Sequence, residues 1–110
     1  MSPVAGIDTI LIVEDDATLN RLLSTQLRAS GYAVVGASCW REAQQHLAGI
    51  EPSLVLLDIN LPDANGLEKI AELSEICPVI VLTAYGSIDQ AVAAIKCGGA
   101  DYLTKPVSPD

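Results

Sequence analysis

Four short apolar runs in this sequence each lead into residues that can do chemistry. One run enters the acidic triplet at 14–16, and another ends at Asp58. The remaining two runs end at Thr83 and at Lys105. If these runs are parallel strands of an open α/β sheet, their carboxyl ends meet at one edge, where such sheets place their ligands. Acids, a hydroxyl and an amine are therefore expected to converge on one site.

The acidic residues Glu14, Asp15 and Asp58 predict a cation site at that edge. Carboxylates gathered in one place repel one another, and Mg²⁺ is the hard cation that favours such oxygen ligands. The triplet also fits the acidic start of a helix, because the helix dipole favours negative charge there. Asp16 is interpreted in this second way, and Asp63 is interpreted as a turn residue.

Composition and charge predict a single globular domain. The chain has 110 residues, of which 50% are hydrophobic, so it can form one core and is too apolar for disorder. The formal net charge of -8 leaves no basic patch, which argues against direct binding of nucleic acid. No apolar run approaches the length of a membrane span. The odd number of cysteines, without CxxC spacing, fits reduced thiols in a cytoplasmic protein.

Strand-like and helix-like segments alternate along the chain. Strands are expected at residues 9–13, 33–37, 54–57, 79–82 and 101–104. Apolar residues at helical spacing predict four helices between them, carrying Leu19, Leu22, Leu23 and Leu27; Trp40, Ala43 and Leu47; Leu67, Ile70 and Ala71; and an inward stripe of Ile88, Ala91, Val92 and Ile95. Strands this apolar are buried on both faces, which implies a parallel sheet covered by helices on both sides.

Local signals place the ends of these helices. Gly31 is expected to stop the first helix, and Gly98-Gly99 the last. Ser38 is expected to cap the second helix, and Asn65-Gly66 to open the third. The segment 87–90 matches a capping box at the start of the fourth helix.

Together these motifs resemble the receiver domain of two-component response regulators over nearly the whole chain. The resemblance rests on residues 12–16, 56–66, 83–86 and 101–106, and the stretch 82–105 is most similar to receivers of sigma-54-dependent activators. It implies an α/β, doubly wound, flavodoxin-like sheet of five parallel strands in the order 2-1-3-4-5. Residues 1–110 would form one receiver domain that is short at its C-terminal end, without the family's fifth helix.

The resemblance also implies a metal and phosphate site. Asp58 would accept the phosphoryl group, because a carboxylate nucleophile can form an acyl phosphate. Mg²⁺ would be bound directly by Asp15 and Asp58, through water by Glu14, and by the backbone carbonyl of Asn60. Four further roles follow from the family pattern.

Lys105 would pair with Asp58 and then with its phosphate. Thr83 would hydrogen-bond a phosphoryl oxygen, and Tyr102 would turn inward when Thr83 moves. Asn60 and Tyr85 would influence the lifetime of the phosphate, because each lies two residues beyond a site residue.

The implied function is a phosphoacceptor signalling domain that takes its phosphoryl group from a sensor histidine kinase or a phosphotransfer protein. No turnover of a separate substrate and no contact with a membrane are expected. Without a fifth helix, apolar atoms around the first and fifth strands are expected to be open to water, and a homodimer is one way of covering them.

Two other classes of protein remain as alternatives. A flavodoxin-like FMN carrier would need hydroxyls and free backbone N–H groups after the first strand, where this chain carries the acidic triplet 14–16. A haloacid-dehalogenase-type phosphatase would carry its nucleophile after the first strand in an Asp-x-Asp pattern. This chain instead has Asp58-Ile59-Asn60 after the third strand.

Overall fold

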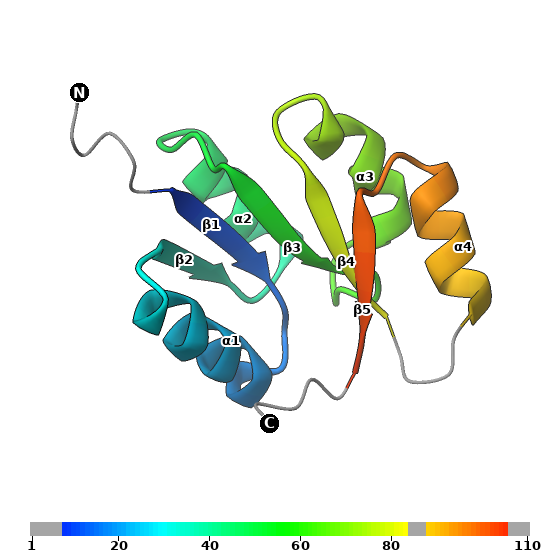
Figure 1. The fold of residues 1–110 in the computed structure, drawn as a ribbon. Helices are drawn as coiled ribbons and strands as arrows, with labels where there is room; N and C mark the ends of the chain where they lie inside the picture. The colour runs from blue at the N-terminus through cyan, green and yellow to red at the C-terminus, as the bar shows by residue number, and fades with distance from the viewer. Residues whose placement is uncertain (1–7, 84–87, 106–110) are drawn as a thin grey trace.

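The computed structural model describes residues 8–83 and 88–105 (Figure 1). Within these ranges the elements alternate regularly between strand and helix. They are β1 (Thr9–Val13), α1 (Ala17–Ala29), β2 (Ala33–Ala37), α2 (Trp40–Leu47), β3 (Leu54–Asp58), α3 (Gly66–Ser74), β4 (Val79–Thr83), α4 (Ile88–Lys96) and β5 (Asp101–Thr104). The predicted strands are confirmed to within one residue at each end.

The five strands form one parallel sheet in the order β2-β1-β3-β4-β5, which confirms the predicted fold class. The register aligns the carboxyl ends of the strands. Val13 pairs with both Ala37 and Leu57, and Asp58 pairs with Leu82. The residues that follow β1, β3, β4 and β5 therefore emerge at one edge of the sheet.

Each face of the sheet packs against its own set of helices. Alternate strand residues face opposite sides, so the sheet supports two separate apolar cores. One core joins the sheet to α2, α3 and α4, and it includes Trp40, Ile70 and Ala94. The other core joins it to α1 through Leu23, with Leu19 and Leu27 packed beside it. Figure 1 shows α1 on the opposite side of the sheet from α2 and α3. The helices thus cover both faces, as the sequence predicts.

Most of the predicted helix ends are confirmed. Gly31 and Gly98 follow α1 and α4 with φ of 100° and 110°, a left-handed conformation that glycine adopts without strain. Asn65 caps α3, since its side chain accepts a hydrogen bond from the Leu67 N–H at 3.0 Å. Ser87, and with it the predicted capping box, lies outside the described residues.

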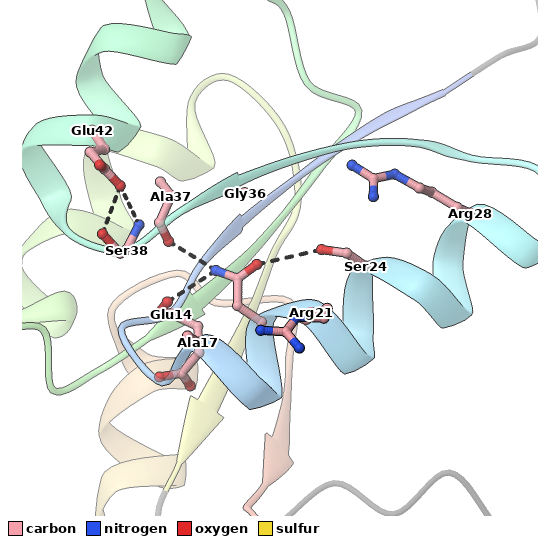
Figure 2. Close-up of a pocket in the computed structure, with 10 residues that line it drawn as sticks. Glu14, Ala17, Arg21, Ser24, Arg28, Gly36, Ala37, Ser38 and Glu42 are labelled. Atoms are coloured by element: carbon pink, nitrogen blue, oxygen red, sulfur yellow. Dashed lines mark hydrogen bonds between the residues drawn. The ribbon is translucent and has the colours of Figure 1, made fainter.

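The predicted cap of α2 is wrong. Cys39, not Ser38, is the N-cap residue, and it makes no side-chain capping bond. The cap comes from Asp63, whose two carboxylate oxygens accept the N–H groups of Trp40 and Arg41 at 2.8 and 3.0 Å. Ser38 instead donates its hydroxyl to Glu42 at 2.7 Å (Figure 2). Asp63 is therefore more than a turn residue. A cap that reaches across more than twenty residues leaves no local pattern in the sequence.

The inward stripe predicted for α4 is only partly correct. Ala91 and Ala94 are buried, whereas Val92 and Ile95 are 46% and 44% exposed. The reason is the position of α4 at the β5 end of the sheet, where no further strand extends beneath the helix. The two alanines face the sheet and let the helix approach closely. The side chain of Ile88 lies outside the described residues, and in α3 the predicted Ala71 is exposed while Leu73 is buried.

Apolar atoms were expected to be open to water around the first and fifth strands, and the structure shows this for only one of the two. In β5, Tyr102 and Leu103 are 43% and 40% exposed, as expected. In β1, Ile10 and Ile12 are fully covered, so the expectation for that strand is wrong. Leu23 of α1 shares an apolar cluster with Ile10 and Ile12, and Leu19 and Leu27 pack beside it.

Two further observations concern helix length and the cysteines. Among the helices of residues 8–83 and 88–105, none is long and apolar enough to cross a membrane. The three cysteines, Cys39, Cys77 and Cys97, are free thiols.

Candidate functional site

Three carboxylates meet at the carboxyl edge of the sheet. Glu14 and Asp15 follow β1, and Asp58 is the last residue of β3. One oxygen from each lies within 4.8 Å of the others. Glu14 and Asp58 are buried, whereas Asp15 is exposed and opens the cluster to solvent. This donor set fits a hard cation such as Mg²⁺, which takes carboxylate oxygens and keeps several waters.

Lys105 places its ammonium between the two buried acids. Its Nζ lies 2.6 Å from Glu14 Oε1 and 3.0 Å from Asp58 Oδ2. The backbone N–H of Lys105 donates to the Thr83 carbonyl at 2.7 Å, which fixes the point where the side chain leaves the sheet. The acids and the amine predicted from strand ends are therefore neighbours in the folded chain, and the backbone of Thr83 lies beside that of Lys105.

The electrostatics of this cluster are set by burial. Burial raises the pKa of Glu14 from 4.5 to about 7, although hydrogen bonds from the Asp16 N–H and Lys105 oppose the rise. The charge of Asp58 adds to it. Burial alone would lower the pKa of Lys105, but its hydrogen bonds to Glu14 and Asp58, and their charges, outweigh burial and raise it. Lys105 is therefore a permanent cation at neutral pH.

The turn after β3 holds Asp58 in place. Asp58 Oδ1 accepts the backbone N–H of Asn60 at 3.0 Å, and the turn closes where Gly66 donates its N–H to Ile59 O at 2.7 Å. A Cβ on Gly66 would lie only 2.5 Å from Asp58 O and 2.7 Å from Ile59 Cα. Sequence reasoning placed Gly66 only at a helix start. The backbone of Asp58 and Ile59 that lies against Gly66 is visible only in the fold.

Thr83 and Tyr102 occupy different surroundings. Thr83 is buried next to Leu82, the register partner of Asp58, and its hydroxyl donates to Leu103 O at 3.4 Å. Tyr102 instead lines a surface groove of about 330 Å³ with Val92 and Ile95 of α4. The structure thus brings Thr83 to the sheet edge and leaves Tyr102 on the outer side of β5. Tyr85 lies outside the described residues.

Comparison of the sequence with known proteins identifies its family. The model of the response regulator receiver domain matches residues 10–110. Regulatory protein AtoC of Escherichia coli is 36% identical over 97% of this chain and 24% of its own length. Chemotaxis protein CheY of Thermotoga maritima is 36% identical over 91% of this chain and 87% of its own length. This chain therefore belongs to the response regulator receiver domain family of two-component systems.

A solved structure supports the same assignment. A response regulator of Burkholderia pseudomallei, with a phosphorylated aspartic acid, calcium ion and citrate, has a TM-score of 0.82 and 32% identity over 92% of this chain and 61% of that one. The predicted likeness to receivers of sigma-54 activators is confirmed by AtoC and related regulators. The FMN carrier and the phosphatase find no support among the matches. The chain spans about a quarter of the length of AtoC.

Proposed function

We propose that this chain receives a phosphoryl group on Asp58, from a phosphohistidine of a sensor histidine kinase or a phosphotransfer protein, in a Mg²⁺-dependent reaction. The observation that carries the proposal is the surroundings of Asp58. It is a buried carboxylate within 4.8 Å of two other acids, with Lys105 Nζ at 3.0 Å. Three clustered carboxylates with one ammonium between them leave excess negative charge, which a divalent cation would offset.

In the proposed transfer, an oxygen of Asp58 attacks the phosphorus atom as the N–P bond of phosphohistidine breaks. The histidine nitrogen keeps the bonding electron pair, and a proton on the other ring nitrogen of the phosphohistidine makes the leaving imidazole neutral. Asp58 becomes an acyl phosphate. Asn60 N–H and Lys105 each hold one oxygen of Asp58, which orients the carboxylate. Lys105 also bonds Glu14, so its ammonium stays anchored while it exchanges Asp58 for a phosphoryl oxygen.

The acids would hold Mg²⁺ in the way the family pattern implies. Asp15 and Asp58 would bind it directly, Glu14 through water, and Asn60 through its carbonyl. When bound, the ion supplies positive charge that lowers the repulsion between the carboxylate and the phosphoryl oxygens. Support comes from the clustered donor oxygens of this chain and from the phosphorylated aspartic acid and calcium ion in the Burkholderia regulator.

The response to phosphorylation would pass through Thr83 and Tyr102. At 3.4 Å, the hydrogen bond from Thr83 to Leu103 O is long, so a charged phosphoryl oxygen would compete for that hydroxyl. Tyr102 would then turn inward from its exposed position beside α4. Asn60, which is exposed, and Tyr85 would influence how long the phosphate survives.

Several wider features remain proposals. The chain would act as a signalling domain without turnover of a separate substrate, as one receiver domain over residues 1–110. A homodimer could cover the exposed apolar residues of α4 and β5. A cytoplasmic location is proposed from the family and the free thiols.

Intact-mass measurement after incubation with acetyl phosphate tests the proposal. One phosphate should be added when Mg²⁺ is present, and none when it is chelated. Asp58→Asn should abolish the addition, while Asp89→Asn, a change to an exposed acid of α4, should retain it. Labelling of Asp58→Asn at the rate of the unmodified chain would refute the assignment.

A further inference from the structure

We propose that Asn20 of α1 is a positioning residue for the acidic loop, and that Gly36 of β2 keeps the space that Asn20 needs. Neither residue touches the reacting atoms. Asn20 would act through the backbone of Glu14, and thereby on Asp15, the next residue in the chain. The inference deepens the proposed function, since it concerns how the cation site is held in shape.

The side chain of Asn20 joins the ends of two neighbouring strands. Its Nδ2 donates to Glu14 O at 3.0 Å and to Ala37 O at 3.1 Å. Ala37 O also accepts the backbone N–H of Glu14 at 3.0 Å. Both backbone polar groups of Glu14 are therefore tied to one small network. Figure 2 shows these bonds reaching Glu14 and Ala37 from α1.

The amide of Asn20 is itself oriented by its surroundings. Ser24 Oγ donates to Asn20 Oδ1 at 3.4 Å. The reverse orientation would place Oδ1 against the carbonyl oxygens of Glu14 and Ala37, which carry no proton to donate. Asparagine is a weaker helix former than alanine or leucine, so α1 gains nothing from it as a helix residue. Its value lies in the two carbonyls that it joins.

Gly36 explains how the amide fits against the sheet. A Cβ at this position would lie 2.8 Å from Asn20 Oδ1, closer than real Cβ contacts allow. The backbone does not require glycine there, because the glycines with positive φ among the described residues are Gly31 and Gly98. Glycine inside a strand weakens it and is typical of a site where another group approaches closely. At Gly36 the approaching group is the Asn20 amide.

A residue that merely satisfied two carbonyls would affect stability alone. A positioning residue also affects the cation site in the fully folded chain, because groups behind metal ligands set the ligands' orientation. Asp16 N–H donates to Glu14 Oε2 at 2.9 Å, so a shift of the Glu14 backbone also disturbs the contact that holds its carboxylate.

Four variants separate these roles: Asn20→Ala, Gly36→Ala, the double variant, and Gly49→Ala as a control. A Cβ on Gly49 meets nothing closer than His46 O at 3.9 Å. Two measurements apply to each folded variant. They are the NMR chemical shift of the Glu14 amide without metal, and the Mg²⁺ dissociation constant from titration.

Asn20→Ala and Gly36→Ala should each move the Glu14 amide signal and weaken Mg²⁺ binding by on the order of tenfold. Gly49→Ala should change neither quantity. Gly36→Ala should add little in the Asn20→Ala background, because the atom it would strike is gone. If Asn20→Ala does not fold, the Glu14 amide shift and the Mg²⁺ affinity of Gly36→Ala test the inference.

Unchanged Mg²⁺ affinity in a folded single variant would overturn the inference, as would fully additive effects in the double variant. If the unmodified chain bound no Mg²⁺, the proposed function would fail instead. The metal-free Glu14 signal would still decide whether Asn20 and Gly36 hold that loop.

Discussion

The two flanks of Asp58 are built differently. On the β1 side, the backbone N–H of Glu14 donates to Ala37 O, and its carbonyl accepts from Asn20. Its two carboxylate oxygens are held by Asp16 N–H and by Lys105. On the β4–β5 side, the Thr83 hydroxyl makes one long hydrogen bond, and every residue of β5 is exposed. The functional groups of one flank are held at many points, whereas the other flank ends in an exposed strand and holds its hydroxyl by one long bond.

This difference matches the different demands on the two flanks. Carboxylates that repel one another keep a shared geometry only if surrounding groups hold them, so the acidic flank needs many contacts. A segment that changes conformation must have two arrangements close in free energy, which strong buried contacts would prevent. We therefore expect the β1 flank to stay fixed and the β4–β5 flank to respond to phosphorylation.

The largest effect on stability is expected from a substitution at Gly66, in the turn after β3. The Cβ of Gly66→Ala would strike the backbone of Asp58 and Ile59, which cannot move without moving the acceptor carboxylate. Overpacking against backbone should lower the free energy of unfolding by about 3 kcal/mol. Chemical denaturation measures this loss, and Gly49→Ala is the matched control. Stability equal to that control would show that the turn after β3 adapts freely.

The burial of Glu14 makes stability depend on pH. Its pKa is about 7 in the folded chain and near 4.5 in the unfolded chain, so the folded chain binds more protons between these values. Stability is therefore highest below pH 4.5 for this group, and falls as pH rises through 7. Without divalent cations, the loss between pH 5 and pH 8 should reach up to about 2 kcal/mol. Thermal melts at several pH values measure how stability changes with pH.

Glu14→Gln is the variant that tests the source of this dependence. It removes the titrating group, so its stability should be nearly independent of pH over the same range. A slope as steep as in the unmodified chain would assign the effect to another group.

The strand ends and the acidic cluster could be predicted because they depend on local apolar runs and on one general property of parallel sheets. The sheet order was predicted only through the resemblance to receiver domains. Three other features could not be predicted. They are the cap that Asp63 makes on α2, the hydrogen bonds from Asn20 to Glu14 O and Ala37 O, and the close approach of backbone to Gly66. Each is a contact between different elements or turns, at separations from six to more than twenty residues, that no periodic pattern in the sequence marks. The inward stripe of α4 failed for a related reason, because helical spacing shows which residues share a face but not where the sheet beneath ends. Val92 and Ile95 lie on the apolar face of α4 but extend beyond the edge of the sheet.

Within the acidic flank, Asp15 and Glu14 should contribute unequally to Mg²⁺ binding. Asp15 is the exposed acid and would bind the ion directly, while Glu14 is already paired with Lys105 and would act through water. Asp15→Asn should weaken Mg²⁺ binding by at least about tenfold, and Glu14→Gln by less. Metal titration at pH 8, where Glu14 is ionised, gives both constants. Equal losses would contradict the division of roles.

The smallest effect on stability, and the sharpest test of the loose flank, is expected at Thr83. Thr83→Ala removes one long hydrogen bond to Leu103 O and leaves the backbone pairing of β4 with β5 intact. Stability should therefore change by less than about 1 kcal/mol. The response to a phosphoryl mimic bound with Mg²⁺ should nevertheless be lost from the NMR signals of α4 and β5, while signals around Asp58 still shift. Thr104→Ala is the control, since Thr104 is the exposed register partner of Thr83. If the unmodified chain itself shifts only around Asp58, then the β4–β5 flank is as fixed as the acidic one, and the contrast between them carries no switch.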